Sequence, residues 1–151
     1  MVRNNVAVAS HAGGIGLGDY GRRGLLRGIV VAHNTVFGNE AGGIVTPENG
    51  VRDALLVNNA AHARVAAPAL PPARNGVRLL DNRDCSLLPC FMNPEARDFS
   101  PLLGAGLVGA GAVRVEPWVP GADYLGNRRR LPPTVGALER PGGPIPLAPE
   151  P

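Results

Sequence analysis

A repeated pattern of asparagine and glycine constrains the possible folds of this chain more than any other feature of its sequence. Asn5 is followed by Gly-Gly-Ile at residues 13–15, and Asn34 is followed by Gly-Gly-Ile at residues 42–44. The step from the asparagine to the first glycine is eight residues in both copies. A third copy begins at Asn59, so the periods are 29 and 25 residues. Repeats of this length indicate a stack of similar structural units.

The segments between these asparagines and glycines have the composition of short β-strands. Gly and Pro together make up about a quarter of the 151 residues and break the apolar runs into short pieces. No stretch shows the sustained apolar spacing at three and four residues that an amphipathic helix requires. Aromatic residues are only 4% of the chain, so Val, Ile, Leu and Ala must form the core. Each repeat is therefore expected to be a coil of two or three short strands.

Stacking the coils in register predicts three columns of equivalent residues. The predicted columns are Ala7, Val36 and Ala61; Ile15, Ile44 and Val77; and Asn5, Asn34 and Asn59. The position of Val77 assumes that residues 66–74 are an insertion in the third coil. Asparagine tolerates the left-handed conformation of a turn, and stacked asparagine side chains can bond along the stack. The glycine pairs are expected to supply a positive φ at the turns.

Several segments of this chain carry a more specific resemblance. The stretch at residues 31–39, followed by Gly43 and Ile44, resembles a coil of right-handed parallel β-helix proteins of the pectin-lyase-like family. Residues 91–106 resemble the end region of secreted bacterial members, and residues 123–139 resemble their closing segment. The resemblance covers roughly residues 1–139. It implies an all-β, right-handed parallel β-helix of about three coils, with an irregular Gly/Pro-rich C-terminal cap.

The same comparison suggests how the chain is divided. Residues 1–106 are expected to form the coils and an exit segment, with the three coils ending near residue 83. Residues 107–139 form the cap, which packs over the last coil or along its side. Trp118 and Tyr124 are its expected aromatic anchors. Residues 140–151, which are rich in proline and glycine, are expected to be a disordered tail.

The N-terminus begins inside a coil. An uncapped coil exposes unpaired backbone groups and an apolar cross-section. We therefore expect this chain to be the C-terminal part of a longer protein. The alternative is end-to-end self-association through the uncapped N-terminal coil.

Cys85 and Cys90 are the two cysteines of the chain. Pro89 lies between them and can turn the chain back, which would bring their Cα atoms into disulfide range. A disulfide would fit an oxidising compartment. The alternative of two buried free thiols stays open. The family resemblance implies an extracellular or periplasmic location.

One predicted column of acidic residues is a candidate metal site. Counting four residues beyond Ile15, Ile44 and Val77 gives Asp19, Glu48 and Asp81. Adjacent strands lie about 4.8 Å apart, so three stacked carboxylates would need a neutralising cation. Calcium accepts such oxygen ligands. The alternative is that these are ordinary acidic residues beside turns.

Lyases of the resembled family hold calcium on acidic side chains, with a basic residue nearby as proton acceptor. By this resemblance, Arg52 and Arg78 are the candidate basic residues for contact with substrate. Tyr20 is a candidate substrate contact as an aromatic ring on which a sugar could stack. No catalytic signature of the family occurs at matching positions, so no catalytic residue can be assigned.

Other site classes are not supported by the sequence. The alignment places His11 with Glu40, His33 with Asn58 and His62 with Phe37, which scatters the histidines and argues against a zinc site. The net charge of +3 includes the run 128–130, which we expect to be solvated. No basic stripe with aromatic residues indicates a nucleic-acid partner. No apolar stretch is long enough to span a membrane.

These observations predict the C-terminal part of a secreted β-helix protein that binds or processes polysaccharide. Cell-surface glycan or polysaccharide is the expected partner, and no complete active site is expected in this chain. If the whole protein is an enzyme, a polysaccharide lyase, hydrolase or epimerase is expected. The alternative is a structural or adhesion module without catalysis, which the scarcity of aromatic residues favours. A truncated gene product without activity is a third possibility.

Overall fold

The protein is essentially all-β and its main sheets are parallel. The computed structural model describes residues 1–18, 25–46, 50–64, 67–73, 76–113 and 119–140. Within these ranges, two sheets contain four strands each and two contain two strands each. The expectation of an all-β chain is therefore confirmed.

Three parallel sheets share the N-terminal half of the chain. The first sheet contains, in spatial order, β1 (Val2–Arg3), β4 (Ile29–Ala32), β7 (Ala54–Val57) and β9 (Val77–Leu80). The second contains β2 (Val6–Val8), β5 (Thr35–Asn39), β8 (Ala60–Ala63) and β10 (Arg83–Asp84). The third pairs β3 (Ile15–Gly16) with β6 (Ile44–Val45). The chain visits the three sheets in turn and then returns to the first, so strands far apart in sequence lie side by side.

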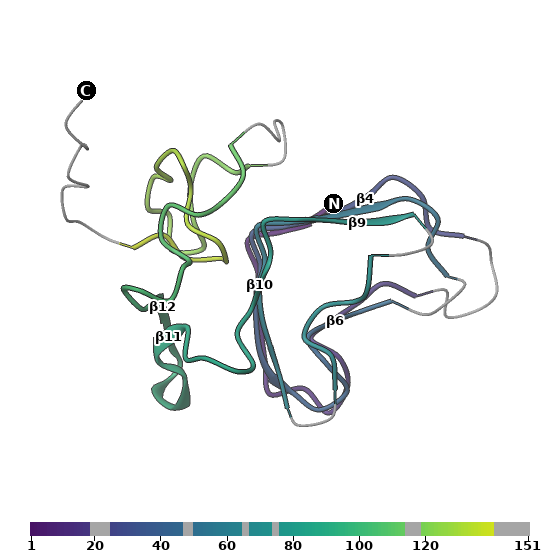
Figure 1. Ribbon diagram of the computed structural model, residues 1–151, viewed down its shortest axis with the longest axis horizontal. Coiled ribbons are helices and arrows are strands. Elements are labelled where there is room, and N and C mark those ends of the chain that lie inside the picture. Colours follow the sequence, from purple (N-terminus) through teal and green to yellow (C-terminus); the bar gives the residue numbers. More distant parts are fainter. Residues whose placement is uncertain (19–24, 47–49, 65–66, 74–75, 114–118, 141–151) are drawn as a thin grey trace.

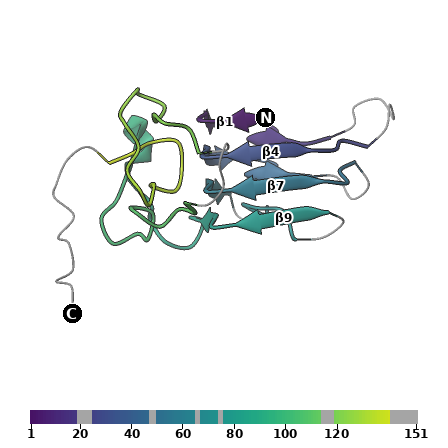
Figure 2. The ribbon, with the colours of Figure 1, turned by 90° about the horizontal axis from the view of Figure 1, so that it is seen from above.

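This path divides residues 2–84 into four stacked layers. Layer 1 comprises residues 2–17, layer 2 residues 29–45, and layer 3 residues 54–64 and 67–70. Layer 4 is shorter and contains only β9 and β10 at residues 77–84. Figure 1 looks along the stack, so the strands of each sheet overlie one another, whereas Figure 2 shows β1, β4, β7 and β9 one above the next.

Most of the predicted register agrees with the structure. Ala7 pairs with Val36 and Val36 with Ala61, and Ile15 pairs with Ile44. The predicted position of Val77 is wrong, because it pairs with Ala54 and opens layer 4.

Pro68 and Ala69 take the places of the two glycines in layer 3, and Leu70 takes the place that was predicted for Val77. The N–H groups of Gly43 and Ile44 donate to the carbonyl oxygens of Pro68 and Ala69, at 3.1 and 2.9 Å. The segment interpreted as an insertion therefore contains the third-layer counterpart of the Gly-Gly-Ile step.

The glycine pairs are needed mainly because other groups approach them closely. A Cβ on Gly14 would lie 2.1 Å from a Val36 methyl group, and one on Gly43 would lie 2.3 Å from the Ala69 carbonyl oxygen. Among the two pairs, only Gly42 has a positive φ, of 119°. The expected use of both pairs for positive φ is therefore wrong for the other three glycines.

The predicted asparagine column forms a continuous hydrogen-bonded ladder. Asn5 donates from its backbone N–H and its Nδ2 to Asn34 Oδ1, at 3.0 and 2.9 Å. Asn34 donates in the same way to Asn59 Oδ1, at 3.0 and 2.9 Å. Asn59 donates to Asn82 Oδ1, at 3.0 and 2.7 Å, which adds a fourth member. The ladder ties every layer to the next and satisfies polar groups that burial would otherwise leave unpaired.

Small aliphatic side chains fill the space between the sheets. Val31, Val36, Ile44 and Leu56 all point inward and are fully buried, as expected for a core with few aromatic residues. The three phenylalanines of the chain lie elsewhere, on the outer face of the second sheet.

The C-terminal half leaves layer 4 through a short hairpin. β11 (Phe91–Asn93) pairs with β12 (Asp98–Pro101) in antiparallel fashion, and the 3-10 helix η1 (Pro94–Ala96) joins them. Irregular chain follows in the described residues 102–113 and 119–140. Figures 1 and 2 show this portion beside the stack, not across its end.

The expected aromatic anchors of the cap do not account for this packing. Tyr124 is 56% exposed and so does not anchor it, contrary to expectation, and Trp118 lies outside the described residues. Of the expected tail, Arg140 donates to the Pro101 carbonyl oxygen at 3.2 Å, and residues 141–151 lie outside the described part.

Candidate functional site

The predicted calcium column contains one residue whose position the structure describes. Asp81 follows Leu80, which pairs with Val57, so Asp81 occupies the position of Asn58 one layer away. Asp81 was placed in the column by counting from Val77, and the register of Val77 is the part that was wrong. Asp19 and Glu48 lie outside the described residues, so a calcium site at those two stays a prediction. Across the described ranges, no group of three His, Cys, Asp or Glu side chains is arranged to hold a metal.

Two of the predicted substrate-binding residues lie at the beginning of the first sheet. Leu26 bridges to Val51, which places Arg27 and Arg52 in register on adjacent layers. Both are exposed. Arg78 lies on β9 and forms an exposed ion pair with Asp53 at 3.5 Å. We call Arg27, Arg52 and Arg78 the arginine cluster; sequence reasoning missed Arg27.

Tyr20, the third predicted contact, lies outside the described residues. Among the described residues, the arginine cluster carries three positive charges, and Asp53, which pairs with Arg78, carries one negative charge.

A column of residues in the left-handed backbone conformation forms the corner between the first and second sheets. Its members are Asn4, His33, Asn58 and Asp81, with φ of 57°, 51°, 56° and 47°. Each immediately precedes a ladder asparagine that bonds along the stack, and the side chains of this corner column point to the outside. A positive φ is uncommon for residues other than glycine, and asparagine and aspartate adopt it most readily. His33 is therefore the unusual member.

The C-terminal segment is hydrogen-bonded to two members of the corner column, Asn4 and Asn58. Asn4 Nδ2 donates to the Ala122 carbonyl oxygen at 2.7 Å. Asn58 accepts from the Ala112 N–H at 2.8 Å and donates to the Ala112 carbonyl oxygen at 3.2 Å. The backbone of Asn58 also accepts from the Gly136 N–H at 2.8 Å. These contacts connect residues more than fifty positions apart in sequence.

His33 is completely buried between the stack and the C-terminal segment. Its Nε2 lies 3.0 Å from Asn58 Nδ2, and because that amide nitrogen can only donate, the imidazole accepts. Burial, together with the positive charge of Arg129, lowers the pKa of His33 to about 3. The carbonyl groups of Gly136 and Thr134 oppose this shift, although neither makes a hydrogen bond of good geometry with Nδ1. The imidazole is therefore neutral at physiological pH.

Arg129 is the centre of the contact on the C-terminal side. Its Nη2 donates to Asn4 Oδ1 at 2.8 Å and to the carbonyl oxygens of Gly136 and Ala137, both at 3.0 Å. Burial lowers the pKa of Arg129, while the negative charges of Glu139 and Asp123 raise it. The expectation that Arg129 is solvated is wrong, because its side chain is only 2% exposed.

Glu139 supplies the counter-charge. Its Oε2 lies 3.7 Å from Arg129 Nη1 and accepts from the Thr134 N–H at 3.1 Å, while Oε1 accepts from the Thr134 hydroxyl. The backbone N–H of Glu139 donates to Asp123 Oδ2 at 2.8 Å. Burial alone would raise the pKa of Asp123, but donation by Glu139 and Asn127 lowers it overall. We call His33, Asn58, Arg129, Thr134 and Glu139 the polar junction.

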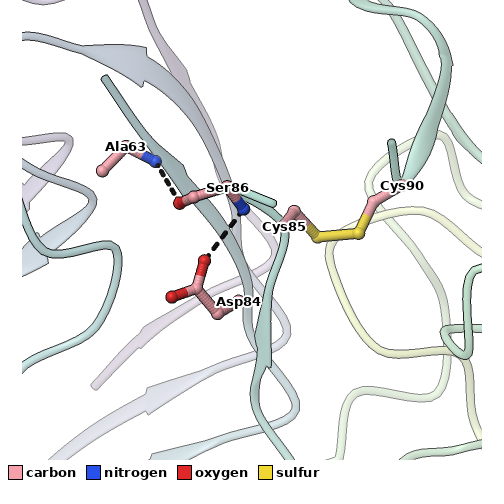
Figure 3. Close-up of a disulfide and its surroundings, with 5 residues drawn as sticks. All are labelled: Ala63, Asp84, Cys85, Ser86 and Cys90. Atoms are coloured by element: carbon pink, nitrogen blue, oxygen red, sulfur yellow. Dashed lines mark hydrogen bonds between the residues drawn. A yellow bond between two sulfur atoms is a disulfide. The ribbon is translucent and has the colours of Figure 1, made fainter. Parts of the chain in front are cut away.

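A pocket lies beside the Cys85–Cys90 disulfide, on the outer face of the second sheet. The two Cα atoms are 5.6 Å apart, and the presence of the disulfide resolves the choice between a bridge and free thiols. The loop after Cys85 is held by Ser86, which donates its N–H to Asp84 at 2.9 Å and accepts from the Ala63 N–H at 3.1 Å. Figure 3 shows the disulfide with Ser86 and the two residues to which Ser86 is hydrogen-bonded. The cavity measures about 310 Å³. Its lining consists of Phe37, His62, residues 85–91 and Pro94.

The aromatic rings of this pocket pack mainly against one another. Phe37 stacks on His62 with ring centroids 4.3 Å apart and meets the edge of Phe91 at 6.0 Å. Gly38 N–H donates to His62 Nδ1 at 3.4 Å, and burial lowers the pKa of His62, so this ring is neutral as well. A ring face that is already covered offers no platform on which a sugar could stack. The pocket is consequently a packing feature of the disulfide loop, and we assign it no chemistry.

The polar junction was not recognisable from the sequence. Arg129, Glu139 and Asp123 lie in irregular chain without periodicity, and most of their partners are groups of the same C-terminal segment. One signal was available: His33 is a histidine at a position where neighbouring repeats have asparagine. In the part of the chain that the structure describes, no helix is long and apolar enough to cross a membrane.

Comparisons of the chain with family models, with curated proteins and with solved structures found no match.

Proposed function

We propose that this chain is the C-terminal, non-catalytic part of a right-handed parallel β-helix protein and serves as the structural module in which the stack ends. The observation that carries the proposal is the asparagine ladder, which runs without interruption from Asn5 to Asn82. A ladder of this kind specifies register and rigidity. Its interior members, Asn34 and Asn59, are completely buried and present no exposed chemical group.

The arrangement of the sheets supports a β-helix. The chain passes through the same three sheets in layers 1 and 2 and through the first two again in layers 3 and 4. Every pairing between layers is parallel. Parallel strands that succeed one another at a spacing of 23 to 29 residues suit a continuous coil.

The polar junction supports a role at the end of the stack. It lies where the C-terminal segment is hydrogen-bonded to layers 1, 2 and 3, through Asn4, Thr35 and Asn58. The segment thereby covers the corner of the stack instead of adding another coil. The disulfide supports secretion, since such bridges persist in oxidising compartments. We accordingly propose an extracellular or periplasmic location.

Thermal unfolding tests the structural proposal. If ladder and junction belong to one module, the purified chain unfolds in a single transition that both near-UV and far-UV circular dichroism detect. Asn59→Ala in the ladder and Arg129→Met in the junction should each lower the midpoint of that same transition. Separate transitions for stack and C-terminal segment would contradict a single module.

Binding of an acidic polysaccharide is the second candidate function, and the arginine cluster is the observation that favours it. Arg27 and Arg52 lie in register on adjacent layers, and Arg78 is on β9 in layer 4. Repeated cations along a stack suit the repeated carboxylates of a polymer. The whole protein would then bind or process such a chain. We assign no lyase, hydrolase or epimerase residue to this portion.

Electrophoresis through gels containing polygalacturonate tests the second candidate. We expect the chain to be retarded and the double variant Arg52→Gln/Arg78→Gln to lose most of the retardation. Arg97→Gln is the matched control, because Arg97 is also exposed but lies on the hairpin away from the cluster. Equal retardation of all three proteins would rule out the cluster as the binding site, and a gel with neutral dextran reports non-specific effects.

A further inference from the structure

The inward-facing columns of the two large sheets end differently in layer 4. In the first sheet, Val31 and Leu56 are followed by Leu79, so an apolar residue remains at the inward position. In the second sheet, Val36 and Ala61 are followed by Asp84. A carboxylate thus occupies the position at which the two preceding layers bury an apolar side chain.

Layer 4 forms an open end of the stack. Leu79 is 37% exposed, whereas Leu56 in the same column is fully buried. Among the described strands, β9 pairs only with β7 and β10 only with β8, so the far edges of β9 and β10 have no strand partner. Figure 2 shows β9 at this end, with the C-terminal portion beside the stack.

The asparagine ladder has a direction, and this direction determines what could continue it. Each asparagine donates from its N–H and Nδ2 to the Oδ1 of the next layer. Within the described structure, the Asn82 N–H has no acceptor, and the Asn5 Oδ1 receives no donor. Layer 1 of a second copy would therefore present the acceptor that layer 4 needs. If two copies met through their layers 4, the Asn82 N–H of one copy would face the same donor of the other, with no acceptor between them.

We infer that Asp84 prevents a further β-helix layer from stacking on layer 4, and layer 1 of a second copy of this chain is the layer that would otherwise fit there in register. Asp84 pairs with Ala61, which pairs through Val36 with Ala7, so Asp84 would face Ala7 of the added copy. Its carboxylate would enter an apolar column, with the Ser86 N–H as its hydrogen-bond donor. An inward-pointing charge is an effective device against strand addition, because a buried carboxylate without a cation is strongly unfavourable.

This inference rests on the proposed role of the chain as the end of a β-helix, and names the residue that keeps the end free. The two can fail separately. The structural module is tested by the cooperativity of unfolding, whereas the role of Asp84 is tested by the state of association of a folded chain.

Sedimentation velocity over a hundredfold range of concentration is the experiment. We expect the wild-type chain to stay monomeric and Asp84→Ala to associate reversibly, at least tenfold more tightly than wild type. Asp81→Ala is the matched control, since it removes an exposed carboxylate from the same layer at an outward position. We expect this control to behave as wild type.

Two further variants keep the experiment decisive. Asp84→Asn removes the charge and keeps an acceptor for the Ser86 N–H, so it reports on association even if Asp84→Ala folds poorly. Adding Asn5→Ala to Asp84→Ala should weaken association, because it removes the acceptor that layer 1 presents. Monomeric Asp84→Ala and Asp84→Asn proteins with native circular dichroism would overturn the inference. So would a wild-type chain that associates as tightly as they do.

Discussion

Asn58 donates a hydrogen bond from its side-chain amide to Nε2 of the completely buried His33, over 3.0 Å. This bond joins two successive layers at the corner column, and the backbone of Asn58 also accepts from the Gly136 N–H. It can exist only while the imidazole is neutral. The structure therefore links attachment of the C-terminal segment to the protonation state of one histidine.

Stability should fall as the pH is lowered through the range below the ordinary histidine pKa. The pKa of His33 is about 3 in the folded chain and 6.5 in the unfolded one. Between these values the unfolded state binds a proton that the folded state excludes, so the free energy of unfolding decreases with falling pH. The decrease approaches about 1.4 kcal/mol for each pH unit. Urea denaturation from pH 7 to pH 4.5 measures it.

His33→Asn is the matched variant for this measurement, since asparagine occupies the same column at Asn4 and Asn58. It should show a shallower dependence on pH than the wild type. His62 contributes in the same direction, because burial lowers its pKa as well, so the difference between the two proteins isolates His33. Identical slopes would show that the folded state tolerates a charged His33.

Removing an interior member of the ladder should destabilise the chain strongly. Asn59→Ala deletes the acceptor of two bonds from Asn34 and the donors to Asn82 and Val31. Groups left buried without partners cost about 1–3 kcal/mol each, so we expect a loss of roughly 2–4 kcal/mol in the free energy of unfolding. Asn5→Ala, at a partly exposed end of the ladder, should cost less than half as much. Equal losses in urea denaturation would mean that burial along the ladder does not matter.

The asparagine ladder could be predicted from the sequence because each stacked layer needs an asparagine at the same position. Asn34 and Asn59 have equivalent neighbours on both sides, and such equivalence leaves a periodic signal. The fourth member, Asn82, was missed because the register of Val77 had been displaced.

That displacement has a physical cause. The third layer meets the glycine-containing step of layer 2 with the backbone carbonyls of Pro68 and Ala69. A proline carbonyl accepts a hydrogen bond as well as a glycine carbonyl, so the pairing requires no glycine. The next glycine that precedes an apolar residue is Gly76, before Val77, and these two residues belong to layer 4. A prediction based on the glycine therefore placed Val77 in the wrong layer.

Truncation of Arg129 should separate the effect of a buried charge from that of an exposed one. Arg129→Met leaves the carboxylate of Glu139 buried without its cation, and breaking such a pair costs about 3–5 kcal/mol. Arg128→Met is the control, because the adjacent Arg128 is exposed and should change stability by less than about 0.5 kcal/mol. The midpoint of thermal unfolding compares the two. Similar small effects would indicate that the junction does not stabilise the fold.

Calcium binding by Asp19 and Glu48 can still be tested, although the register that added Asp81 to the acidic column was wrong. We expect calcium to raise the midpoint of thermal unfolding if Asp19 and Glu48 hold the ion, and this rise should be lost in Asp19→Ala. Asp81→Ala should retain it, because Asp81 lies at the corner column and was included with the other two only through the wrong register of Val77. A rise that Asp81→Ala abolishes would contradict this placement. The absence of any rise on adding calcium, or of any fall on adding a chelator, would remove the site.

Reduction of the disulfide should loosen the loop that carries Ser86 and lines the pocket. A bridge between residues five positions apart stabilises a folded chain by about 2 kcal/mol, through the entropy it removes from the unfolded state. We expect dithiothreitol to lower the free energy of unfolding by that amount. Hydrogen exchange at the Ala63 amide, which donates to Ser86, should become faster at the same time. The double variant Cys85→Ser/Cys90→Ser should be insensitive to dithiothreitol and should already resemble the reduced protein. If reductant changes the stability of that variant as much as that of the wild type, the effect does not come from this bridge.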